Sequence, residues 1–209
     1  SPFEDEVCGD GIDNDCDGIP AGCIAGINSL TAANTKITGE PVANEGAGRS
    51  VSNAGDVNGD GFGDIIVGAP ASYAGLPIAQ SGAAYVILGS ANGIPNMSLV
   101  DADAKLSAES AGDSAGRTVS TAGDFDGDGF DDIVVGAQGN EDGAAYLILG
   151  SAAGMVEMGL GNADAKFTSA IGDTAGNGVS SAGDVNDDGF DDLLIGASNL
   201  TGGAVYLIL

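Results

Sequence analysis

The sequence predicts an all-β chain of three four-stranded blades of the β-propeller type, arranged as an open array. Three observations carry this prediction. A pattern of roughly 60 residues occurs three times between residues 29 and 209. Short apolar, β-rich runs alternate with glycine-rich turns, and no amphipathic stretch is long enough for a helix. Four strands per repeat is typical of a propeller blade, and since propellers close with roughly 4 to 8 blades, three cannot form a ring.

The repeats are expected at about 29–97, 98–158 and 159–209, and each should hold four strands in the same order. The first strand follows a lysine, the second precedes an acidic loop, the third follows that loop and the fourth ends the repeat. Their expected positions are 36–38, 105–107 and 166–168; 48–55, 116–123 and 176–183; 65–69, 133–137 and 193–197; 82–88, 143–149 and 203–209. Small residues and continuous apolar runs predict that the sheets stack face to face.

The acidic loop is the most informative part of each repeat. Its three copies span 56–64, 124–132 and 184–192, and they start 68 and 60 residues apart. The middle copy places carboxylates at positions 1, 3, 5 and 9 of the loop and glycine at position 6. Oxygens on alternate residues of a tightly curled segment converge on one point, where calcium can take roughly 6 to 8 of them. Three copies in phase with the larger repeat therefore predict three calcium sites.

Each predicted site uses the side chains at positions 1, 3, 5 and 9 and the backbone carbonyl at position 7. The predicted ligands are Asp56, Asn58, Asp60, Phe62 and Asp64 in the first loop, Asp124, Asp126, Asp128, Phe130 and Asp132 in the second, and Asp184, Asn186, Asp188, Phe190 and Asp192 in the third. Because asparagine at position 3 is neutral, the first and third sites should bind calcium more weakly. The ring of Phe130 is expected to anchor its loop on the core, and Asp131 at position 8 to lie in solvent.

Residues 1–28 form a separate segment rich in cysteine and aspartate. Asp13, Asp15 and Asp17, followed by glycine, repeat positions 1, 3, 5 and 6 of the loop, but position 9 is alanine. A fourth calcium site is therefore expected here, and the alternative is an acidic disulfide-bonded tail. The segment resembles a short cysteine-framed, Asp-rich metal motif of large secreted bacterial proteins. Its cysteines, which would form one disulfide and leave one thiol in an oxidising compartment, are Cys8, Cys16 and Cys23.

Charge and composition exclude several classes of function. The net charge of −26 would repel nucleic acid and anionic membrane surfaces, and no run of 18 apolar residues encodes a transmembrane helix. Histidine is absent, which removes His-based triads, and three cysteines cannot make a four-cysteine zinc site. Asp131 and Asp132 could serve a glycosidase as paired carboxylates, but the loop pattern assigns Asp132 to metal. The chain is therefore expected not to be an enzyme.

The repeats resemble the FG-GAP family, which builds the propellers of integrin α-subunits and occurs in many secreted bacterial proteins. The resemblance covers about residues 29–209 and is most specific in the core Gly-Asp-x-[Asn/Asp]-x-Asp-Gly-x-x-Asp. It implies a calcium role for the three loops. The Gly-Ala-Pro signature is intact at 68–70 but altered at 136–138 and 196–198, and Phe-Gly is replaced by Ala-Gly in every repeat. These departures argue against integrin-like ligand binding.

The expected function is that of a calcium-binding structural or adhesion protein, secreted or at the cell surface. In the family the outer strand of a blade is often supplied by the next repeat, so the last blade should have an open edge near 204–209. That edge could pair with the N-terminal strand of another copy and join chains into fibres. Its partners would then be copies of itself or other extracellular proteins. The alternatives are a fragment of a larger secreted propeller that binds a protein or glycan, and a non-catalytic domain of a secreted hydrolase.

Overall fold

The computed structural model describes residues 30, 33–41, 46–70, 81–139, 143–169, 173–198 and 202–209. The chain divides into two compact units, Ser1–Lys36 and Ile37–Leu209, and the described strands belong to the second. The predicted N-terminal calcium site (Asp13, Asp15, Asp17) and the three cysteines lie outside the described residues. Among the residues that are described, no helix is long and apolar enough to cross a membrane.

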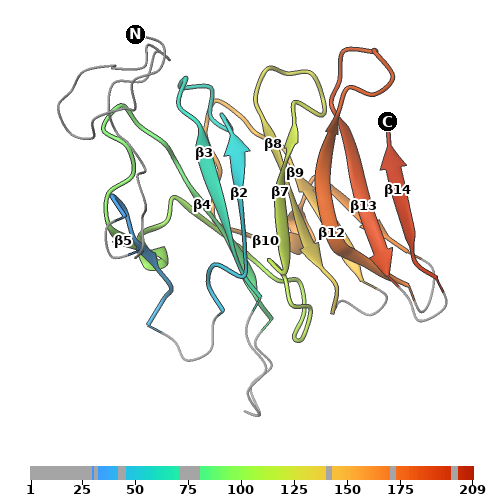
Figure 1. Cartoon of the computed structure of the whole chain (residues 1–209), viewed down its shortest axis with the longest axis horizontal. Helices are drawn as coiled ribbons and strands as arrows, with labels where there is room; N and C mark the ends of the chain where they lie inside the picture. The colour runs from blue at the N-terminus through green and yellow to red at the C-terminus, as the bar shows by residue number, and fades with distance from the viewer. Residues whose placement is uncertain are drawn as a thin grey trace, which may run out of the picture. The chain divides into compact units, whose positions relative to one another are not determined.

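The regular elements of the second unit are almost all strands, and most of these strands fall into three blades standing side by side (Figure 1). Blade 1 consists of β2 (Ser50–Gly55), β3 (Asp64–Ala69), β4 (Ala83–Ile87) and β6 (Ala104–Ser107). Blade 2 consists of β7 (Thr118–Gly123), β8 (Asp132–Ala137), β9 (Ala144–Ile148) and β11 (Ala165–Thr168). Blade 3 consists of β12 (Thr174–Gly183), β13 (Asp192–Ser198) and β14 (Ala204–Ile208). The remaining elements are β1 (Ile37–Thr38), β5 (Met97–Ser98), β10 (Met158–Gly159) and the 3-10 turns η2 (Leu99–Asp101) and η3 (Leu160–Asn162).

The outer strand of each complete blade comes from the start of the next repeat. β6 pairs antiparallel with β4, and β11 pairs antiparallel with β9. In the described chain β14 pairs with β13 alone. The prediction of three blades in an open array is therefore confirmed. Within the described residues blade 3 has no outer strand, as predicted, and four strands are present only in blades 1 and 2.

The short strand β1 marks the opposite end of the array. It pairs in parallel with β5, with Ile37 opposite Met97, just as β6 pairs in parallel with β10, with Leu106 opposite Met158. β1 thus lies beside the segment that follows blade 1 in the same way that β6 lies beside the segment that follows blade 2. β6 is also the outer strand of blade 1, whereas β1 pairs with β5 alone in the described chain.

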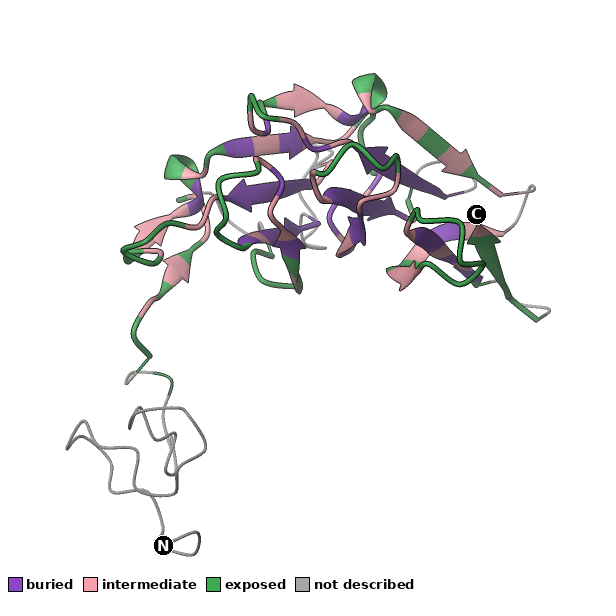
Figure 2. Ribbon diagram, turned by 90° about the horizontal axis from the view of Figure 1, so that it is seen from above, coloured by how far each residue is buried: buried purple, intermediate pink, exposed green. Residues whose placement is uncertain are grey.

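Alternating side chains of each central strand pack on the two neighbouring blades. In β8, Ile133 and Val135 belong to the apolar cluster shared with blade 1, whereas Val134 belongs to the cluster shared with blade 3. Figure 2 shows that buried residues concentrate in the middle strands of the array. Because both faces of these strands are covered, they are continuously apolar, as the sequence predicted. Each buried Val, Leu or Ile contributes about 1.5–3 kcal/mol.

Glycines let the backbones of neighbouring blades touch. A Cβ atom on Gly68 of β3 would lie 2.0 Å from the carbonyl oxygen of Gly116, and one on Gly136 of β8 would lie 2.2 Å from that of Gly176. Real Cβ atoms do not approach backbone oxygens so closely, so these positions accept only glycine. The predicted face-to-face stacking of the sheets is confirmed, and the backbones approach closely at these glycine pairs.

Candidate calcium loops

Each acidic loop begins at a β-bulge in the strand that leads into it. The pairing of the two strands that flank the loop shifts register just before the loop, and the residue at the shift is a glycine with positive φ. A bulge of this kind bends the strand sharply, so the aspartate that follows turns into the loop. The three glycines, with their φ angles, are Gly55 (82°), Gly123 (73°) and Gly183 (67°).

The second loop brings three of its predicted ligands together. One carboxylate oxygen from each of Asp124, Asp126 and Asp128 lies within 4.8 Å of the others. Asp124 Oδ2 accepts the N–H of Gly129 at 3.0 Å, whereas its Oδ1 is buried and has no hydrogen-bond partner among the described residues. An unpaired buried carboxylate oxygen is costly, and a hard cation coordinated by oxygen would satisfy it. The residues present therefore fit calcium.

The first and third loops have the same backbone but a different charge at position 3. Asn58 Nδ2 donates to Asp60 Oδ2 at 3.0 Å, and Asn186 Nδ2 donates to Asp188 Oδ2 at 2.8 Å. In these two loops the side-chain amide at position 3 therefore donates a hydrogen bond to the carboxylate at position 5. In the second loop both positions are carboxylates, Asp126 and Asp128. This difference explains why three carboxylates gather only in the second loop of the described chain.

The first aspartate of each loop organises the turn by accepting backbone N–H groups. In the third loop, Asp184 Oδ2 accepts from Gly189 at 2.8 Å and Oδ1 accepts from Asp188 at 3.1 Å. The bond from Gly189 is the main cause that lowers the pKa of the Asp184 carboxyl. In the first loop, Asp56 accepts from Gly61 at 2.8 Å and from Asp60 at 3.0 Å in the same way. The backbone of these loops therefore stabilises the ionised carboxylate of the aspartate at position 1.

The position-9 aspartates are buried and held by backbone donors. Asp132 Oδ2 accepts the N–H of Phe125 at 2.9 Å, and its Oδ1 accepts the N–H of Gly150 at 2.7 Å. Burial raises the pKa of the Asp132 carboxyl to about 6 and also raises the pKa of Asp64. Asp132 lies outside the group of three carboxylates, so its role as a ligand stays a prediction. In the third loop, Asp192 Oδ1 is buried without a partner in the described chain.

Position 7 does not place its ring where the sequence led us to expect. A Cβ atom on Gly59 would lie 2.5 Å from Cε1 of Phe130, and one on Gly127 would lie 2.4 Å from Cε1 of Phe190. The Phe130 ring therefore lies on the loop of the preceding blade, and the prediction that it anchors on the core is wrong. The first ring of the series, Phe62, is exposed.

Position 8 also differs from its prediction. Asp131 is partly buried, and its Oδ2 accepts the N–H of Asp56 at 2.7 Å. It points away from its own loop, as expected, but it contacts the preceding loop and does not lie in solvent. The prediction is wrong because the contact lies between two repeats, and the pattern of a single repeat does not contain it. A sequence signal was present: position 8 reads Gly63, Asp131 and Asp191, so the first repeat differs from the two that follow another blade.

Comparison with known proteins agrees with the repeat structure. The FG-GAP repeat model matches residues 47–87, 115–148 and 175–208, which contain the first three strands of the three blades and cover more than half of the chain. FG-GAP repeats commonly bind calcium, and the Asp124, Asp126 and Asp128 group lies inside the second match.

Several integrin α-subunits and a phospholipase are related to the chain. Integrin alpha-PS5 of Drosophila melanogaster is 34% identical over 157 residues, which are 73% of this chain and 15% of that protein. Human integrin alpha-IIb is 32% identical over 72% of the chain and 15% of its own length. The bovine phosphatidylinositol-glycan-specific phospholipase D is 35% identical over 71% of the chain and 18% of its own length. The chain thus spans less than a fifth of these relatives, and it belongs to the FG-GAP repeat family.

Proposed function

We propose that the chain is a calcium-binding, extracellular or cell-surface blade array that forms part of a larger β-propeller, whose assembled blades bind a protein or glycan ligand. The observation that carries the calcium role is the second loop, where three carboxylates converge and one buried oxygen of Asp124 has no described partner. The match to the FG-GAP family supports the same role.

In this proposal calcium supplies positive charge that the loops need. The bound ion would neutralise carboxylates that otherwise repel one another in each tight turn. The chain's own contribution is to aim the ligands: the bulge at Gly123 turns Asp124 into the loop, and the backbone donors of Phe125 and Gly150 fix Asp132 where β8 begins. Each filled loop would therefore rigidly join the two strands that flank it, such as β7 and β8 in blade 2.

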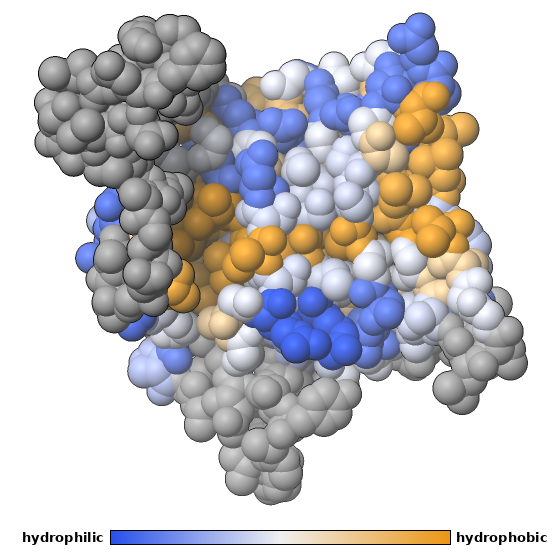
Figure 3. Space-filling view, in the orientation of Figure 1, coloured by the Kyte–Doolittle hydropathy of each residue, from blue (hydrophilic) through white to orange (hydrophobic). Residues whose placement is uncertain are grey.

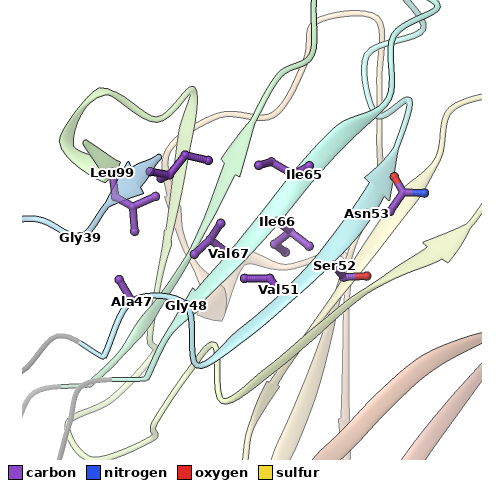
Figure 4. Close-up of a pocket in the computed structure, with 11 residues that line it drawn as sticks. Gly39, Ala47, Gly48, Val51, Ser52, Asn53, Ile65, Ile66, Val67 and Leu99 are labelled. Atoms are coloured by element: carbon purple, nitrogen blue, oxygen red, sulfur yellow. The ribbon is translucent and has the colours of Figure 1, made fainter. Parts of the chain in front are cut away.

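One face of blade 1 is covered by no other blade among the described residues, and this face supports the larger propeller. Val51 of β2 is 65% exposed, whereas Val119, its counterpart in β7, is 5% exposed because blade 1 covers it. Figure 4 shows the groove on this face, into which Val51, Ile65 and Val67 point. The groove lies on the face of blade 1 that is equivalent to the face of blade 2 packed against blade 1. An additional blade of the same family is the occupant that such a surface fits.

The proposal includes no catalytic role. One relative is named as a phospholipase D, but the shared segment is 18% of that protein. This chain contains no histidine, and the position-8 carboxylate that could have paired with Asp132 as a catalytic dyad is bonded to Asp56 instead. A non-catalytic domain of a secreted hydrolase remains compatible with these observations.

Isothermal titration calorimetry tests the calcium role through one ligand. Asp128→Ala should lower the number of calcium ions bound by one, because it removes a position-5 oxygen from the group of three carboxylates. Glu157→Ala is the matched control, since it removes an exposed carboxylate outside the loops and should leave the stoichiometry unchanged. A chain that binds no calcium, or an Asp128→Ala variant that binds as many ions as the unaltered chain, would refute the assignment.

A second candidate function, end-to-end assembly, is favoured by the open edge of β14. Its exposed apolar side chains gather along one side of the molecule (Figure 3); they are Val205, Tyr206, Leu207 and, just beyond the strand, Leu209. In blade 2 the corresponding Ala145 pairs with Phe167 of β11. The same register would set Val205 opposite Ile37 in β1 of a second copy, and the heterologous contact would propagate.

Analytical ultracentrifugation in millimolar calcium tests this assembly. The chain should form oligomers whose size grows with concentration, and Val205→Lys should return it to the monomer because it places a charge on the pairing edge. Val156→Lys is the control, since Val156 is comparably exposed outside the blade strands. A chain that stays monomeric at every concentration would contradict end-to-end pairing. Equal dissociation of the oligomers in the Val205→Lys and Val156→Lys variants would also contradict it.

A further inference from the structure

Neighbouring loops are joined by one aspartate that the calcium pattern itself does not require. The Oδ2 atom of Asp131, at position 8 of the second loop, accepts the N–H of Asp56, the first residue of the first loop, at 2.7 Å. The N–H of Asp131 returns a bond to the carbonyl oxygen of Asp56 at 3.2 Å. Asp191 repeats both bonds on Asp124, at 3.0 and 3.1 Å. The last residues of one loop thus hold the first residue of the loop before it.

The contact is closely packed as well as hydrogen-bonded. A Cβ atom on Gly55 would lie 2.3 Å from Cγ of Asp131, and one on Gly123 would overlap the Asp191 carboxylate. Gly183, the equivalent residue of the third loop, has no described heavy atom within 4 Å of such a Cβ. The bulge glycines of the first two loops therefore make room for the incoming aspartate, and the contact exists only where another blade follows.

The contact between Asp131 and Asp56 is adjacent in sequence to the predicted ligands of both the first and the second loop. Asp131 lies between Phe130, whose carbonyl is the predicted position-7 ligand of the second loop, and Asp132, its predicted position-9 ligand. Calcium in the second loop would therefore fix the backbone on both sides of Asp131. Asp131 in turn fixes Asp56, whose carboxylate holds the first loop closed by accepting from Asp60 and Gly61.

We propose that Asp131 and Asp191 are positioning residues that couple neighbouring calcium sites, so that calcium in one loop raises the calcium affinity of the loop before it. This inference rests on the proposed calcium function. Because binding free energies are reciprocal, the earlier loop must raise the affinity of the later one by the same factor. The array then holds two couplings, first to second loop and second to third, since the first loop has Gly63 at position 8.

Calcium titration followed by two-dimensional NMR can report on each loop separately. The amides of Gly61, Gly129 and Gly189 each donate to the position-1 aspartate of their own loop, so their resonances should shift as that loop fills. In Asp131→Ala, the midpoint for Gly61 should move to about tenfold higher calcium, the scale of one lost hydrogen bond to a charged group. The midpoint for Gly189 should move much less, since Asp131 does not contact the third loop and can affect it only through the second.

Two further variants separate the hydrogen bond from charge and from general loss of structure. Asp131→Asn keeps an oxygen that can accept from the Asp56 amide, so it should restore most of the lost affinity. Asp191→Ala should weaken calcium binding at Gly129 and provides an independent case in the next loop pair. Disabling the second loop with Asp128→Ala should weaken binding at Gly61 when Asp131 is present and have no further effect in Asp131→Ala.

The outcomes distinguish this inference from the function on which it rests. If the three glycine amides of the unaltered chain do not respond to calcium, both the proposed function and the coupling are refuted. If they respond but Asp131→Ala leaves the Gly61 midpoint unchanged, only the coupling is refuted. Equal weakening by Asp131→Ala and Asp131→Asn would also overturn it, because the effect would then come from charge and not from the hydrogen bond to Asp56.

Discussion

Chelation of calcium is expected to lower the melting temperature of the chain by on the order of 20 °C. The loops contain 13 of the 31 acidic residues of a chain with a net charge of −26, and each loop confines its carboxylates to nine residues. Without a cation these carboxylates repel one another, and the buried Oδ1 of Asp124 stays unpaired in the described chain. Calcium should therefore act as a folding ligand.

The expected size follows from mass action. At a calcium concentration 100-fold above the dissociation constant, each independent site adds ~2.7 kcal/mol to the free energy of unfolding, so three sites add about 8 kcal/mol. Differential scanning calorimetry in millimolar calcium and in excess chelator measures the change. Magnesium is a useful control, because it prefers a stricter octahedral geometry and gives up its water reluctantly. Equal melting temperatures with calcium and with chelator would contradict a folding role for the metal.

The effect of pH should have opposite signs with and without calcium. Without calcium, burial raises the pKa of Asp132 to about 6, so the folded chain holds this proton more tightly than the unfolded chain. The resulting stability is present below the unfolded pKa of about 4 and is lost as pH rises through about 6. With calcium, the ionised carboxylate is the form that binds, so stability should increase over the same range. The same scans at pH 4, 5, 6 and 7 measure both trends.

The sequence was sufficient to predict what depends on one repeat at a time. Apolar strands and acidic loops recur with the repeat, and the family model matches the first three strands of every blade. The open edge of β14 was also predictable, because the strand that covers an edge comes from the following repeat. These features follow from local pattern and from the order of strands along the chain.

What the sequence did not predict are the contacts between repeats. Asp131 looked like a spare solvent-exposed carboxylate, because within its own loop it has no function, and only blade stacking brings it to the amide of Asp56. The ring of Phe130 reached Gly59 for the same reason. The informative signal lay in the exceptions at the two ends: position 8 is Gly63 in the first loop, and position 4 is Asp187 in the third, where the others have glycine.

The contact between blades 2 and 3 gives the second large expected effect. Gly136→Ala would place a Cβ atom 2.2 Å from the backbone oxygen of Gly176 and equally close to Oγ1 of Thr118. A backbone oxygen cannot turn aside as a side chain can, so the blades must separate, which exposes the apolar cluster between them. We expect a loss of about 3 kcal/mol in the free energy of unfolding, or roughly 10 °C in melting temperature.

Gly196→Ala is the matched control, because Gly196 holds the same place in β13 that Gly136 holds in β8. With no described blade against that face, the nearest atom to its Cβ would be the Gly178 oxygen at 3.5 Å, which is an ordinary van der Waals contact. Urea denaturation at saturating calcium should therefore show a large loss of stability for Gly136→Ala and little change for Gly196→Ala. Equal losses from the two variants would mean that alanine is disfavoured by the strand itself, and that the close approach of the blades at Gly136 does not stabilise the array.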